Sequence, residues 1–96
     1  MGSVARRSSN SWMVTATGKS GHSSGIFSAG AGDGAIFELT RILSRFRAEL
    51  PEPNLTFNIG IITGGQEASL DADGVRAIAK GKTNIIPGIA IARGDF

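Results

Sequence analysis

Residues 33–51 read DGAIFELTRILSRFRAELP and carry the strongest structural signal in the sequence. Apolar side chains recur there at steps of three and four residues, which is the period of one helical face. The members of this face are Ala35, Ile36, Leu39, Ile42, Leu43, Phe46 and Leu50. Asp33 is suited to cap the first turn, and Pro51 stops the helix from continuing. We therefore predict one long amphipathic helix that packs its apolar face against the rest of the domain.

Stretches on both sides of this helix predict β-strands. Residues 12–17 alternate between the two faces of an extended chain, which is the period of a half-buried strand. Residues 55–63 alternate in the same way and predict a second strand. Residues 83–96 are rich in β-formers and predict one further strand, bent at Pro87 and antiparallel to the second.

Three segments have a different composition. Residues 18–34 are rich in glycine, serine and alanine and predict a long loop, a feature that is often functional. Residues 66–82 hold a turn signal at 71–74 and predict a hairpin, to which the sequence gives no function. Residues 1–10 predict an N-terminal tail or linker, and Met1 to Ser3 are typical of residues left by an expression vector. The domain itself is expected over residues 11–96.

The number of elements predicts an incompletely covered sheet. A helix is about 10 Å wide, and strands lie about 4.8 Å apart, so one helix shields only about two strands. The rest of that sheet face needs a second helix or a partner.

Composition excludes several classes of protein. The chain has 96 residues, which is one small domain, and no cysteine, so disulfides, thiolate metal clusters and thiol nucleophiles are excluded. The net charge is only +2, which does not indicate a nucleic-acid partner. No apolar run is long enough to cross a bilayer, and the N-terminus lacks the apolar segment of a signal peptide. The compartment stays open, with the cytoplasm favoured.

Two glycine motifs resemble nucleotide-binding sequences, but neither meets the full requirements of its motif. Gly18-Lys19-Ser20 lacks the glycine that a P-loop needs five residues earlier, where Met13 stands. The G-x-G-x-x-A match at residues 30–35 opens a helix but lies too far from the preceding strand. We assign no nucleotide site.

Polar candidates for chemistry are few. His22 is the single histidine and lies in the glycine-rich loop, where it is either functional or an ordinary exposed residue. A two-metal hydrolytic site needs several His, Asp and Glu ligands, so this chain alone cannot build one. Asn84 carries an amide that could donate to a carbonyl or carboxylate, and a polar bend between strands is an equally good interpretation.

Five segments, taken together and in this order, resemble one known family. They are Gly18–Ser24, Asp33–Ile36 at the start of a helix, Asn58–Gly60 with Gly64-Gly65, Asn84–Pro87, and Ala92–Phe96. The chain is similar to the dimerisation (lid) domain of the zinc-dependent aminoacylase, glutamate carboxypeptidase and acetylornithine deacetylase metallopeptidases.

This resemblance implies an α+β, ferredoxin-like two-layer sandwich with an antiparallel sheet. The present chain holds one long helix and ends before the family's second helix and last strand. In the family this domain interrupts a separate catalytic domain of the same parent chain, which holds two zinc (or cobalt) ions. The resemblance also implies a homodimer formed through the helix and a sheet edge. No metal ligand is expected in this chain, because the family's ligands lie in the catalytic domain.

The resemblance also implies roles for individual residues. His22 matches the histidine that reaches the active site of the other subunit and stabilises the oxyanion there. Asn84 matches an asparagine that helps bind substrate, with the Gly64-Gly65 loop beside it. The implied function is that of a lid and dimerisation domain in a metal-dependent peptidase or amidohydrolase, cleaving an amide bond of a peptide or an N-acyl amino acid. The isolated chain should be inactive. The alternative is a stand-alone α/β interaction module in which both side chains are ordinary loop residues.

Overall fold

The structure is a computed structural model that describes residues 2–8, 11–27, 32–49 and 57–95. Its centre is a four-stranded antiparallel sheet with the strand order β1-β2-β8-β4. The strands are β1 (Gly2–Ser8), β2 (Ser11–Thr17), β4 (Asn58–Gly65) and β8 (Ile89–Asp95). With the helix α1 (Ala35–Glu49), this arrangement confirms the α+β class and is compatible with a ferredoxin-like sandwich.

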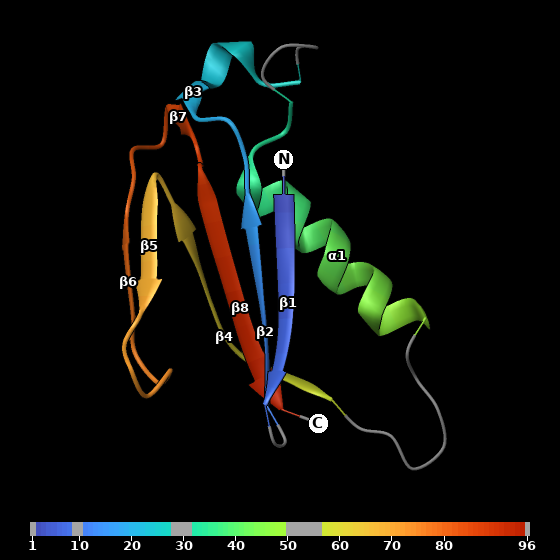
Figure 1. Cartoon of the computed structure of the whole chain (residues 1–96). Coiled ribbons are helices and arrows are strands. Elements are labelled where there is room, and N and C mark those ends of the chain that lie inside the picture. The colour runs from blue at the N-terminus through green and yellow to red at the C-terminus, as the bar shows by residue number, and fades with distance from the viewer. Residues whose placement is uncertain (1, 9–10, 28–31, 50–56, 96) are drawn as a thin grey trace.

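Two small antiparallel sheets accompany the central one. The first joins β3 (Gly21–His22) to β7 (Ile85–Ile86), and the short helix η1 (Ser23–Gly25) follows β3 directly. The second is the hairpin of β5 (Glu67–Leu70) and β6 (Ala77–Lys80), as predicted for residues 66–82. In Figure 1, α1 lies on one side of the central sheet, the hairpin lies on the other, and β3 and β7 lie together at one end.

The core forms between α1 and the two middle strands. Its buried members are Trp12, Val14 and Ala16 of β2, Ala90 and Ala92 of β8, and Ala35, Leu39 and Leu43 of α1. The predicted helical face is thus confirmed for five of its six described members, with Ile42 and Phe46 packed at the margin of the core. Ile36, the sixth, is 40% exposed and lies outside the core. The alanines let the helix approach the sheet, and the Trp12 and Phe46 rings close one end in an edge-to-face contact at 6.4 Å.

Helix α1 begins one residue later than a cap at Asp33 would place it. The first helical hydrogen bond runs from the Glu38 amide to the Gly34 carbonyl at 3.2 Å. The Ala35 amide, which has no partner within a helix, donates instead to the Pro87 carbonyl at 3.0 Å. The start of the helix is therefore held by the chain that enters β8. The predicted end, at Leu50 and Pro51, lies outside the described residues.

Strand β4 is only partly covered by α1. The pairing register of β4 shifts between Ile59 and Ile61, so that Ile59 lies opposite Gly94 and Ile62 lies opposite Ala92. Both isoleucines are therefore on the helix side of the sheet, where α1 packs on β2 and β8. Ile59 is 41% exposed and Ile62 is 55% exposed, so the helix does not cover them. This confirms that one helix shields about two strands. Residues 55 and 56 of the predicted strand lie outside the described part of the chain.

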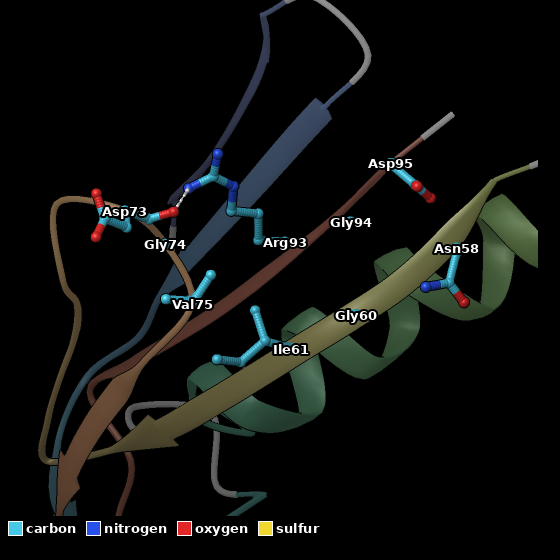
Figure 2. Close-up of a pocket in the computed structure, with 9 residues that line it drawn as sticks. All are labelled: Asn58, Gly60, Ile61, Asp73, Gly74, Val75, Arg93, Gly94 and Asp95. Carbon is cyan, nitrogen blue, oxygen red and sulfur yellow. Dashed lines mark hydrogen bonds between the residues drawn. The ribbon is translucent and has the colours of Figure 1, made fainter.

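The opposite face of β4 and β8 is covered by the β5–β6 hairpin. Figure 2 shows the Arg93 side chain reaching from β8 to the turn of the hairpin, where its Nη1 donates to the Asp73 carbonyl at 3.3 Å. Gly74 lies against the same guanidinium, with φ at 70°, a conformation that favours glycine. A single arginine thus ties the hairpin turn to the sheet.

Three sequence-based expectations differ from the structure. Residues 2–8 form strand β1, paired along its length with β2, where we predicted a tail; the free edge of β2 offers backbone groups to any extended segment beside it. Residues 85–95 form two strands in different sheets, because the chain turns at Pro87 to meet α1. The long loop predicted after β2 contains β3 and η1.

Candidate functional site

The strand ends on the α1 start side are tied together by two backbone hydrogen bonds. The Gly18 amide donates to the Gly88 carbonyl, and the Gly88 amide donates to the Gly65 carbonyl, each at 3.0 Å. These bonds join the end of β2, the start of β8 and the end of β4. We call the part of the molecule around Gly18, Gly65 and Gly88 the glycine end. Of the predicted site residues, Gly64 and Gly65 lie on it, His22 lies in β3, and Asn84 directly precedes β7.

His22 and Asn84 are brought together by the β3–β7 pairing. His22 lies opposite Ile85 in that register, and the Ser23 amide donates to the Asn84 carbonyl at 2.8 Å. Ser20 adds a side-chain anchor, because its Oγ donates to the Ile86 carbonyl at 3.0 Å. Both His22 and Asn84 are exposed. The two polar side chains that we singled out from the sequence are 62 positions apart, yet His22 lies in β3 and Asn84 lies directly before the paired strand β7, and both are open to solvent.

The imidazole of His22 is held by the residue two places after it. Its Nδ1 accepts a hydrogen bond from the Ser24 amide at 3.1 Å, and the Ser24 Oγ lies 2.9 Å from the same nitrogen. This contact makes His22 the N-terminal cap of η1. The ring is exposed, as in an ordinary loop histidine, but one of its two nitrogens is engaged. Sequence reasoning missed Ser24, although a polar side chain in a loop often hydrogen-bonds the backbone two residues later.

Gly64 and Gly65 allow close packing at the glycine end. A Cβ on Gly64 would lie 2.8 Å from Ile36 Cγ1, and one on Gly65 would lie 2.7 Å from the Lys80 carbonyl oxygen. Both glycines line an open cavity of about 400 Å³, together with Lys80 and Lys82. The two lysines give this cavity a positive rim that we did not expect from the sequence. Asn84 lies next to two of the lining residues, Thr83 and Ile85, but does not line the cavity itself.

A second hollow lies at the other end of β8 and contains none of the predicted site residues. Its volume is about 390 Å³, and its polar lining comes from Asn58, Asp73, Arg93 and Asp95 (Figure 2). Arg93 is already engaged with the hairpin turn there.

Metal-ligating side chains do not gather in the part of the chain that the structure describes. Across residues 2–8, 11–27, 32–49 and 57–95, no three His, Asp or Glu side chains are placed to hold one ion. The described helices also include none that is long and apolar enough to span a membrane.

The fold and the glycine end define an α+β sandwich with a one-sided helix layer, a partly uncovered sheet face and an exposed histidine turn. Residues 4–96 match the family model described as the peptidase dimerisation domain, so the chain belongs to that family. The family predicted from the five sequence segments is thereby confirmed. No curated protein and no solved structure matches the chain.

Proposed function

We propose that this dimerisation domain is the lid of a metal-dependent peptidase or amidohydrolase that cleaves an amide bond of a peptide or N-acyl amino acid. The family match over residues 4–96 is the observation that supports this proposal most strongly. The scattered positions of the described acidic side chains and His22 agree with metal ions held by a separate catalytic domain. Bound there, zinc or cobalt ions would activate the attacking water. The isolated chain would catalyse nothing.

The proposed homodimer uses the outer edge of β4 and the flank of α1. Three isoleucines, Ile36, Ile59 and Ile62, lie on the helix side of the molecule and are between 40% and 55% exposed; we call them the β4 strip. Strand β4 is an edge strand of the central sheet, and an edge strand can pair with a strand of another chain. Two copies paired edge to edge through β4 would extend the sheet and cover both β4 strips.

His22 is proposed to act on the active site of the partner subunit. Its ring is exposed on a short turn at the glycine end, where backbone hydrogen bonds fix the chain on both sides. An imidazole N–H aimed at the scissile carbonyl would stabilise the negative charge that develops on its oxygen. Asn84, which directly precedes the neighbouring strand β7, is proposed to bind substrate beside it, together with Gly64 and Gly65 at the end of β4.

Mixed dimers of the assembled enzyme test the action in trans. One subunit carries His22→Ala, and the other carries an intact His22 with its metal ligands removed. We expect each pure variant dimer to lose turnover, by about 100-fold or more for His22→Ala. Metal content and dimerisation of the His22→Ala enzyme should be unchanged. The mixed dimer should regain about half of the wild-type rate, because one complete centre forms from two damaged subunits.

The same experiment can refute the proposal. A mixed dimer as inactive as both parents would mean that His22 serves its own subunit or none. Lys19→Ala is a suitable control, since Lys19 is an exposed neighbour of the same loop to which we assign no role.

A further inference from the structure

The hydrogen bond between Ser24 and His22 fixes which ring nitrogen carries the proton. A backbone amide can only donate, so the Nδ1 of His22 must present its lone pair to the Ser24 N–H at 3.1 Å. In a neutral imidazole the proton then resides on Nε2. A proton on Nδ1 would point at the hydrogen of the Ser24 amide and break the contact.

The Ser24 hydroxyl is compatible with this tautomer, because a hydroxyl can donate as well as accept. Its Oγ lies 2.9 Å from Nδ1, and it can direct its own hydrogen to the lone pair that the amide already uses. Both donors come from one residue and converge on one nitrogen. Within the described residues, no hydrogen bond to Nε2 is formed, so the N–H of that nitrogen points away from the turn.

We propose that Ser24 is a positioning residue that holds His22 as the Nε2–H tautomer, ready to donate to a substrate oxyanion. This inference rests on the proposed function of His22 in catalysis. The opposite tautomer would turn a lone pair toward the oxyanion and repel it, so the choice of tautomer decides whether the ring stabilises or destabilises the developing charge. The anchor from Ser23 to Asn84 keeps the turn in place while the ring is engaged.

Nitrogen NMR of the ¹⁵N-labelled chain tests the tautomer directly. At about pH 8.5, where a histidine is ordinarily neutral, we expect Nε2 to show the shift of a protonated ring nitrogen and Nδ1 that of an unprotonated one. A scalar coupling should also connect the Ser24 amide nitrogen with Nδ1 across the hydrogen bond. The chain has one histidine, so the ring signals need no further assignment.

Three variants separate the parts of the contact. Ser24→Ala keeps the amide and should retain both the coupling and the Nε2–H tautomer. Ser24→Pro removes the amide hydrogen and should abolish the coupling and average the two nitrogen shifts. Ser23→Ala is the matched control, because the hydrogen bond from its backbone amide to the Asn84 carbonyl survives and its hydroxyl is not used by the ring. The coupling and the separate nitrogen shifts should both persist.

The outcomes distinguish this inference from the function on which it rests. Absence of the coupling in the wild-type chain, or a dominant Nδ1–H signal, overturns the inference, whatever His22 does in the enzyme. Both results are measured on the wild-type chain, so they do not require the proline variant to fold. In the assembled enzyme, Ser24→Pro should lower kcat with KM little changed, while metal content stays normal. An intact coupling combined with full activity of His22→Ala would instead refute the proposed catalytic role.

Discussion

At the residue scale, Gly34 connects the helix to the glycine end. Its φ is 85°, and a Cβ at this position would lie 2.6 Å from the Ile86 side chain. Its carbonyl also accepts the first hydrogen bond of α1. Gly34 therefore has a backbone conformation that a side chain disfavours, and it also lies close to β7, the strand that pairs with β3.

Gly34→Ala should lower the free energy of unfolding by about 1–3 kcal/mol, because it adds left-handed strain to a steric clash. Chemical denaturation followed by Trp12 fluorescence measures this change. Gly25→Ala is the matched control, because nothing lies within 4 Å of its added Cβ; its effect should stay within about 0.5 kcal/mol. Equal effects at the two positions would show that Ile86 does not pack against Gly34.

At the element scale, α1 depends on Leu39 more than on its own helical propensity. Leu39 is fully buried and faces the alanines of β8 and the apolar side chains of β2. A single helix of this length is marginal in water by itself, so its packing against the sheet supplies most of its stability.

Leu39→Ala should therefore cost about 2–5 kcal/mol, a large share of the stability of a small domain. Thermal unfolding followed by circular dichroism would show the loss. Thr40→Ala is a control on the next position of the same helix, where the side chain is exposed and bonds only to its own helix, at Ile36. Wild-type stability of Leu39→Ala would contradict the core described above.

The sequence predicts those elements whose signal is local. The helical spacing of apolar residues over 35–49 predicts α1, and the alternation of Trp12, Val14 and Ala16 predicts the buried face of β2. The position of β1 cannot be read in this way, because only the free edge of β2 decides that residues 2–8 pair there. The division between β7 and β8 likewise depends on Pro87 meeting the Ala35 amide, a contact between distant parts of the chain.

The same distinction applies to the candidate site. His22 and Asn84 stand out as residue types, but their closeness is a property of the β3–β7 sheet, and Ser24 gains its role only once the turn is formed. The lysine rim beside Gly64 and Gly65 depends on where the β5–β6 hairpin returns to the central sheet. Short turns and side-chain anchors of this kind need the assembled fold.

At the scale of the whole molecule, we expect the isolated chain to have no catalytic activity. The purified domain, supplied with zinc or cobalt, should hydrolyse neither N-acyl amino acids nor dipeptides above the rate of the metal-containing buffer. The reason is that the proposed metal ligands lie on a different domain, and the described side chains do not form a cluster of their own. Turnover that follows the protein through purification would refute the lid assignment.

Sedimentation equilibrium measures whether this domain associates with its own copy through the β4 strip. The wild-type chain is compared with Ile62→Lys and with Ile78→Lys, a matched isoleucine that is 75% exposed on the hairpin, across the sheet from the strip. Burying an exposed isoleucine typically stabilises an interface by about 1.5–3 kcal/mol. Ile62→Lys should thus weaken association at least about tenfold.

We predict that the wild-type and Ile78→Lys proteins approach twice the monomer mass of 9.9 kDa as concentration rises. Ile62→Lys should remain near 9.9 kDa at the same concentrations, with the circular dichroism spectrum of the folded wild-type chain. A wild-type chain that stays monomeric at every concentration, or a dimer that Ile78→Lys disrupts and Ile62→Lys does not, would contradict the account.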